Sequence, residues 1–288
     1  MLGPRPVCAR VAVGVAVGAW SSFQAPGARA AGCEAQVSHA RLNSRLFASS
    51  SRREGPSHAK QSNPRVIRIA LTGGPCAGKS SALGQITQEA TARGFDVYSA
   101  PETPTLLFHT GAKLPAKSDG EEMFHFQRSL MQLQLQIEAS LTSIARSTGR
   151  PTIIIFDRGL LDPRGYMAPE IWDRVLGSLS DGSGRSVDET RLLARYEGVI
   201  HLVTAADGAE EFYKWGKVAD DSGKEVSRTE SPEEARALDV KMQECWRGHP
   251  NHMVIHNTVG GFKAKLKDAE SFVLRIAEES ATSVNKEQ

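Results

Sequence analysis

Cysteine is scarce in this chain of 288 residues: the four cysteines are Cys8, Cys33, Cys76 and Cys245. They are widely spaced and form no CxxC pair, so the sequence indicates neither a zinc site nor a disulfide framework. The formal net charge is only +2, which gives no electrostatic case for a nucleic-acid partner. No apolar run reaches the length that a membrane-spanning helix needs. The remaining composition is that of an ordinary globular protein, with 40% hydrophobic and 24% charged residues.

Acidic residues are almost absent from the first 65 positions, which hold only Glu34 and Glu54. Arginines precede a weakly apolar run at residues 11–20, as in a signal peptide, and the whole segment is rich in arginine and serine, as transit peptides are. We therefore predict that residues 1–65 are a targeting peptide, for a plastid reached through a two-part leader or for a mitochondrion. The alternative is a disordered leader without an address, which would leave the protein cytoplasmic.

The strongest motif in the chain follows directly after this leader. Residues 66–71 are β-branched or apolar apart from Arg68, which predicts a buried strand. Residues 73–80 then match G-x-x-x-x-G-K-[ST], the phosphate-binding loop. Its glycines let backbone N–H groups approach a triphosphate where no Cβ obstructs them. The residues predicted to bind the nucleotide in this stretch are Gly73, Gly74, Pro75, Cys76, Ala77, Gly78, Lys79, Ser80 and Ser81.

Within this loop, two side chains have predicted roles of their own. Lys79 would reach the β- and γ-phosphates of ATP or GTP, and Ser80 would ligate Mg²⁺. The helix that opens near Gly78 adds the positive end of its dipole. Cys76 is interpreted as a small residue that the loop tolerates, although its position also raises the question of redox chemistry.

Strand and helix patterns alternate through the rest of the chain. Further strands are predicted at 95–100, 152–156, 198–204 and 253–255, and helices at 79–93, 103–110, 118–147, 169–179, 186–196, from 231 onward and at 262–279. The run at 152–156 is apolar throughout, which is typical of parallel strands buried on both faces. The predicted fold class is therefore α/β: a P-loop NTPase with a kinase-like, parallel, five-stranded sheet flanked by helices. Residues 66–288 form the nucleotide-binding domain, with a helical lid inserted at about 206–250.

Polar residues stand at the predicted carboxyl ends of two strands, where ligands of such sheets bind. Asp157 follows the strand at 152–156 and is expected to help hold Mg²⁺. Arg158 comes next and would stabilise the transferring phosphate; the alternative is a solvated loop arginine. Glu102 would accept the proton of an attacking hydroxyl, or else it only stabilises the start of the following short helix.

Further residues are candidates for the lid, the base contact and the substrate pocket. Arg228, before the helix that starts at Ser231, is the best candidate for a lid arginine, ahead of Arg236, which has Glu233 as a potential partner on its own helix. Asn257 is placed to contact the base, but it would also suit a simple turn. Gln127 and Arg128 lie on the long helix, whose start would line a substrate pocket, although a solvated face is the favoured interpretation.

With these residues in place, the chain resembles the P-loop family that groups the ribosylnicotinamide-kinase domain of NadR with the TRPL-translocation-defect proteins. The resemblance covers about residues 66–276 and rests on the segments 69–80, 101–103, 156–159, 228–236 and 249–250. It is closer to the translocation-defect branch, because no adenylyltransferase domain is evident. The resemblance implies binding of ATP or GTP with Mg²⁺.

Two functions follow as expectations. The first is a Mg²⁺-dependent kinase that moves a γ-phosphoryl group to a hydroxyl of a small, nucleoside-like acceptor. The second is a nucleotide-binding regulatory or trafficking protein whose output is a partner or an anionic lipid surface, met by Lys263, Lys265 and Lys267. Three lysines are more often a solvated face, and no guanine-specifying motif argues for GTP over ATP.

Overall fold

The computed structural model describes residues 65–181, 184–219, 225–228 and 230–284. The predicted leader up to residue 64 lies outside this part. The elements in chain order are β1 (Val66–Gly73), α1 (Lys79–Ala92), β2 (Asp96–Ala100), α2 (Thr103–His109), α3 (Glu121–Ser147), β3 (Thr152–Asp157), η1 (Asp162–Tyr166), α4 (Pro169–Gly177), α5 (Glu189–Leu193), β4 (Gly198–Leu202), η2 (Glu210–Phe212), β5 (Gly216–Ala219), β6 (Glu225–Arg228), α6 (Pro232–Cys245), β7 (His252–Ile255) and α7 (Gly261–Val284). None of the helices in these ranges is long and apolar enough to cross a membrane.

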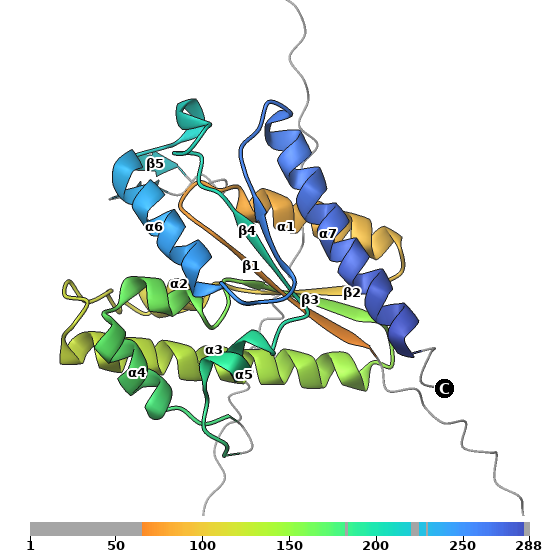
Figure 1. The fold of residues 1–288 in the computed structure, drawn as a ribbon, viewed down its shortest axis with the longest axis horizontal. Coiled ribbons are helices and arrows are strands. Elements are labelled where there is room, and N and C mark those ends of the chain that lie inside the picture. The colour runs from red at the N-terminus through yellow and green to blue at the C-terminus, as the bar shows by residue number, and fades with distance from the viewer. Residues whose placement is uncertain (1–64, 182–183, 220–224, 229, 285–288) are drawn as a thin grey trace, which may run out of the picture. The chain divides into compact units, whose positions relative to one another are not determined.

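Five strands form one parallel sheet in the order β2-β3-β1-β4-β7 (Figure 1). The phosphate-binding motif follows the central strand β1, so strands on both sides bring their carboxyl ends to it. This confirms the predicted α/β fold of the P-loop kinase type. Sequence analysis missed a two-stranded antiparallel ribbon, β5-β6, which lies inside the predicted lid.

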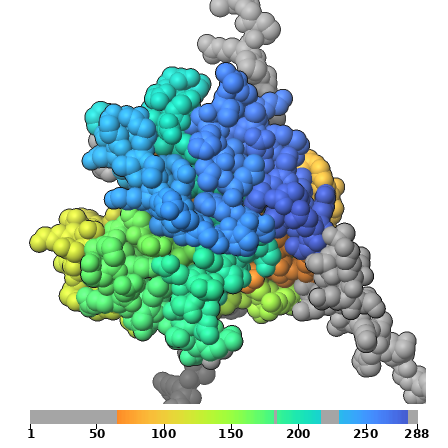
Figure 2. Space-filling view, viewed as in Figure 1, coloured from red at the N-terminus to blue at the C-terminus, as the bar shows by residue number. Residues whose placement is uncertain are grey.

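Both faces of the sheet are buried. Along β3, Ile154 and Phe156 face a core shared with α3 and α4, whereas Ile153 and Ile155 face a core shared with α1 and α7. The helices of both layers are visible in Figure 1, and the space-filling view shows little of the central strands (Figure 2). Burial on two faces is the reason why β3 reads as an uninterrupted apolar run.

The long helix α3 buries more polar residues than its pattern predicted. Gln127, Gln134 and Glu138 are buried, whereas the apolar Ile144 of the same helix is 53% exposed. The Glu138 carboxylate accepts hydrogen bonds from Arg195 Nε at 2.7 Å and from the Tyr196 hydroxyl at 2.6 Å. Partners from outside α3 therefore make Glu138 tolerable in the core.

The sequence has the capping-box pattern at two helix starts, Ser186–Glu189 and Ser231–Glu234, and only the second forms one. At α6, the Ser231 side chain accepts from Glu234 N and the Glu234 side chain accepts from Ser231 N, as predicted. At α5, the cap is Asp188 instead of Ser186, and the helix spans only five residues. The Asp188 carboxylate accepts from Arg191 N at 2.8 Å and so takes over the role expected of Ser186.

Candidate functional site

The phosphate-binding motif forms the turn between β1 and α1. Gly73 has a φ of +138°, and a Cβ added there would lie 2.1 Å from the Leu202 carbonyl oxygen of β4. Only glycine fits at such a close approach of two strands. Helix α1 begins at Lys79 with no side-chain cap, so its first N–H groups are not satisfied by a capping side chain. Ser80 and Ser81 lie exposed in its first turn.

Lys79 points back toward the loop. Its Nζ donates to the carbonyl oxygens of Gly73 at 3.1 Å and of Gly74 at 3.0 Å. Burial, followed by repulsion from Arg158, lowers the pKa of Lys79 to about 8. Phosphate oxygens of a nucleotide would offer this ammonium group a stronger, charged partner than the two carbonyls do.

Arg158 and Glu102, which were predicted separately, form one ion pair. Arg158 Nε donates to Glu102 Oε1 at 2.5 Å, and its guanidinium also donates to the Gly73 carbonyl oxygen at 3.3 Å. Burial alone would raise the pKa of Glu102, but Arg158 and a hydrogen bond from Thr105 lower it below its ordinary value. Glu102 is therefore an ionised carboxylate, paired with an arginine that also contacts the first residue of the loop. Arg158 is 13% exposed and does not have the solvated side chain of the alternative interpretation.

The Arg158 backbone is strained into this position. Its φ is +71°, a left-handed conformation that residues other than glycine rarely adopt. Arg158 N donates to the Leu71 carbonyl oxygen at 3.0 Å, and its own carbonyl oxygen accepts from Gln134 Nε2 at 2.9 Å. These two bonds hold the strained residue, and such strain is concentrated at functional sites.

The surroundings of Asp157 suit a carboxylate that binds a cation. Asp157 ends β3, and its buried Oδ1 has no hydrogen-bond partner in the part of the chain that the structure describes. Burial raises the pKa of Asp157, and the charge of Lys79 offsets part of this rise. The Asp157 oxygen, which accepts no hydrogen bond from the described residues, and the Ser80 hydroxyl at the start of α1 are oxygen ligands of the kind that Mg²⁺ prefers when phosphates supply its other ligands.

Asp162 of η1 is a residue that sequence analysis missed. Its Oδ1 accepts from the Thr72 hydroxyl at 2.8 Å and from Trp246 Nε1 at 2.6 Å. Its Oδ2 lies 3.8 Å from an Arg158 guanidinium nitrogen. Asp162 therefore joins the end of β1, the site arginine and the end of α6. The sequence signal was an acid followed by proline five residues beyond the end of a buried strand.

Predicted site residues line two cavities. The first, of about 170 Å³, is lined by Glu102, Arg158 and Asp162, by the α3 residues Gln127 and Gln134, and by apolar groups that include Phe108 and Phe126. Gln127 is thus a cavity residue with 2% exposure, and the prediction of a solvated face is wrong for it. The second cavity, of about 500 Å³, is lined by Cys76, Ala77 and Gly78 and by Phe212, Asn257, Phe262 and Lys265.

Asn257 and Lys265 hold each other at the second cavity. Asn257 Nδ2 donates to the Thr204 and Asp207 carbonyl oxygens at 2.8 and 2.7 Å, and its Oδ1 accepts from Lys265 Nζ at 2.8 Å. The Asn257 side chain therefore shapes the turn, while contact with a base stays a prediction. Lys265 is 3% exposed, and Lys267 pairs with Glu270, so neither belongs to a free basic face.

The predicted lid arginines are placed differently from one another. The Arg228 backbone ends β6, and its side chain lies outside the described part. Arg236 donates to the Ala206 carbonyl oxygen at 2.6 Å and to Glu233 at 3.0 Å, as its alternative interpretation expected.

The Cys76 thiol lies 3.7 Å from the Lys214 carbonyl oxygen.

Comparison with known proteins places the domain in a family. The AAA domain family matches residues 68–264, more than half of the chain. The chain belongs to the AAA domain family. It is a nucleotide-binding P-loop protein. The comparison with curated proteins gave no match. Among solved structures, this AAA domain is similar to a deoxyadenosine kinase from M. mycoides with bound dATP, at 16% identity and a TM-score of 0.39, covering 70% of this chain and 95% of that one.

Proposed function

We propose that this AAA domain is a Mg²⁺-dependent kinase that transfers the γ-phosphoryl group of ATP or GTP to a hydroxyl of a small, nucleoside-like acceptor. The observation that carries the proposal is the pair of cavities at the two ends of one phosphate loop. One borders Gly78 at the end of the loop, and the other contains Arg158, which contacts Gly73 at its start. A kinase needs two such places, one for each substrate, whereas a protein that only binds a nucleotide needs one.

The charges of the smaller cavity favour an acceptor without a phosphate group. Three acids line it, Glu102, Asp162 and Glu230, against the single arginine Arg158. That arginine is already committed to Glu102 and to Asp162. A phosphorylated acceptor would meet repulsion there, whereas a flat, neutral or cationic molecule would fit between the aromatic walls.

In this proposal Glu102 orients the acceptor hydroxyl and takes its proton. The hydroxyl oxygen forms a bond to the γ-phosphorus, the bond from that phosphorus to the β–γ bridging oxygen breaks, and the β-phosphate leaves with the nucleoside diphosphate. Lys79 and Arg158 bind the oxygens on which negative charge is held. Mg²⁺, held by Ser80 and Asp157, would neutralise charge shared between the β- and γ-phosphates.

The test is an acceptor screen with the full-length protein. MgATP and MgGTP are each offered with a set of nucleosides and with their 5′-monophosphates, and formation of the phosphorylated product is measured. Glu102→Gln should keep nucleotide binding within about threefold but lower transfer by about 10² to 10⁴, because it removes the proton acceptor and leaves the loop in place. Lys79→Ala should lose both.

Two results would contradict the proposal. One is that the wild-type protein binds MgATP or MgGTP but phosphorylates none of the acceptors. The other is that Glu102→Gln transfers phosphate as fast as the wild type. Slow hydrolysis without transfer would favour the regulatory alternative.

A second prediction concerns pH. Because the pKa of Lys79 is lowered to about 8, its ammonium group loses the proton as pH rises through that value. MgATP binding measured by calorimetry should therefore weaken by roughly tenfold between pH 7 and pH 9, as the protonated fraction falls from about nine-tenths to about one-tenth.

Variants assign this pH dependence to one lysine. Lys265 also has a pKa lowered to about 8, by its burial. Lys265→Met should keep the dependence on pH, whatever its affinity, whereas Lys79→Arg should lose it because a guanidinium stays charged. An unchanged slope in Lys79→Arg would show that another group is responsible.

A further inference from the structure

The Asp239 side chain of helix α6 contacts the phosphate loop. Asp239 is 2% exposed on the inner side of this helix. Its Oδ1 accepts the N–H of Gly74 at 2.8 Å and the N–H of Thr204 at 3.0 Å. The Thr204 hydroxyl in turn donates to the Pro75 carbonyl oxygen at 2.6 Å. The first residues of the loop are thus held from α6 and from the end of β4 together.

The other oxygen of Asp239 is also surrounded by donors. Oδ2 accepts from Gln243 Nε2 at 3.0 Å and lies 3.1 Å from Nε2 of the buried His201. Burial alone would raise the pKa of Asp239, but the His201 imidazole beside Oδ2 and the hydrogen bonds from Gln243 and Gly74 lower it below its ordinary value. An ionised carboxylate, which only accepts hydrogen bonds, suits this position.

The same contact explains a glycine of the loop. A Cβ added to Gly74 would lie 2.6 Å from Asp239 Oδ1 and 2.9 Å from Thr204 Cβ. Gly74 is not among the residues with a left-handed backbone, so packing against Asp239 and Thr204 restricts this position. Its carbonyl oxygen is one of the two that hold Lys79 Nζ.

We propose that Asp239 is a positioning residue for nucleotide binding. It holds the Gly74 peptide so that the loop and the bound end of Lys79 keep one geometry, and it ties the helix of the predicted lid segment to that loop. The inference rests on the nucleotide-binding part of the proposed function and does not require phosphoryl transfer. Preorganised loops bind more tightly because less ordering is left to the binding step.

The test compares three variants of the full-length protein by calorimetry with MgATP. Asp239→Ala removes both acceptor oxygens and should weaken binding at least tenfold. Asp239→Asn keeps one acceptor oxygen toward Gly74 and Thr204 and should stay within about threefold of the wild type. Met242→Ala, fully buried one turn along the same helix, is the matched control, because it loosens α6 without touching the loop.

A coupling experiment uses Gly74→Ala. This variant should also bind MgATP at least tenfold more weakly, because its methyl group meets Asp239. In the double variant with Asp239→Ala, the fold-loss of MgATP affinity should be smaller than the product of the two single losses. The reason is that the carboxylate that the added methyl group meets is then absent. Multiplicative effects would indicate that the two residues act independently.

Three outcomes would overturn the inference: wild-type affinity in Asp239→Ala, an equal loss in Met242→Ala at a matched loss of thermal stability, or failure of Asp239→Asn to restore binding. A wild-type protein that binds MgATP but transfers no phosphate would remove the kinase proposal alone. A wild-type protein that binds no nucleotide would remove both.

Discussion

Replacing Arg158 with methionine should lower kcat for phosphoryl transfer by about 10³-fold, while MgATP binding changes by less than about tenfold. The guanidinium contacts Gly73 and Glu102 at once, so in the proposed reaction it touches both the phosphate end and the acceptor end of the site. Arginines that stabilise a transferring phosphoryl group contribute at least this much to kcat. Steady-state kinetics combined with calorimetry separates the two effects.

Two further variants show whether geometry or charge matters at this position. Arg158→Lys keeps the charge but cannot make the same pair of contacts, so it should restore kcat only in part. Arg164→Met, a half-exposed arginine of the neighbouring η1 segment, is the matched control and should retain nearly full activity. Equal activities in Arg158→Met and Arg164→Met would refute the role proposed for Arg158.

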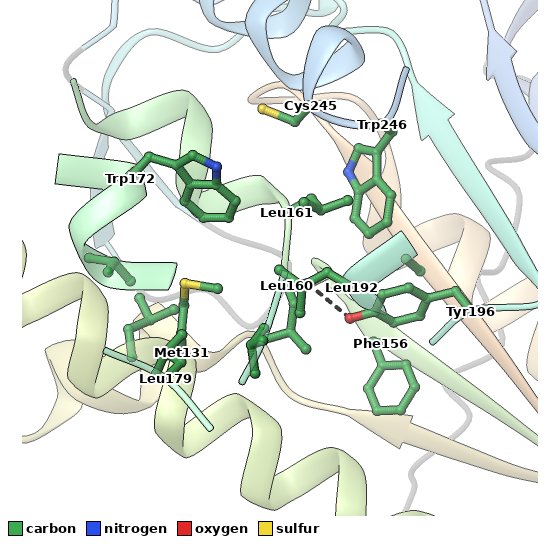
Figure 3. Close-up of a cluster of buried hydrophobic side chains, with 14 of the residues drawn as sticks. Met131, Phe156, Leu160, Leu161, Trp172, Leu179, Leu192, Tyr196, Cys245 and Trp246 are labelled. Atoms are coloured by element: carbon green, nitrogen blue, oxygen red, sulfur yellow. Dashed lines mark hydrogen bonds between the residues drawn. The ribbon is translucent and has the colours of Figure 1, made fainter. Parts of the chain in front are cut away.

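Replacing Trp246 with alanine should lower the free energy of unfolding by about 3–5 kcal/mol, as truncations of fully buried aromatic residues do. Trp246 is 0% exposed, and its ring meets that of Tyr196 edge-on with centroids 5.3 Å apart (Figure 3). Its Nε1 also donates a hydrogen bond to Asp162. The substitution leaves a cavity next to Gly159 and removes one donor from a buried carboxylate. Urea unfolding followed by circular dichroism measures the loss.

Trp215 supplies the control for this measurement. It is 61% exposed, so Trp215→Ala should change the unfolding free energy by less than about 0.5 kcal/mol. Trp246→Phe should lie between the two, because it keeps most of the packing but not the bond to Asp162. A loss below about 1 kcal/mol in Trp246→Ala would mean that the end of α6 does not belong to the core.

Sequence patterns predicted the strands of the parallel sheet, most of the helices and the loop, since their signals are local. The capping box at Ser231 and the apolar run of β3 are examples, because each involves only neighbouring positions. The capping box at Ser186 failed because Asp188, two residues later, binds an N–H of the same turn. Competing local caps of this kind are hard to rank from sequence.

Buried polar residues were the main error. Gln127 and Asp239 are polar residues, for which a solvated side chain is the usual expectation, yet both are buried, and Lys265 was grouped with exposed lysines. Asp239 had a usable signal, since it falls within the helical spacing that joins the buried Ala235 and Met242. An acid inside an apolar stripe implies donors from other elements, but it does not say which.

By itself, the sequence determined the phosphate loop, the parallel α/β sheet and the set of charged residues at its strand ends. The tertiary structure alone decided how those residues pair. Arg158 meets Glu102 across 56 positions of sequence, and Asp239 meets Gly74 across 165. The reason is physical: loops and strands follow from local steric and hydrogen-bonding preferences, whereas a buried charge is stable only where the fold brings distant donors to it.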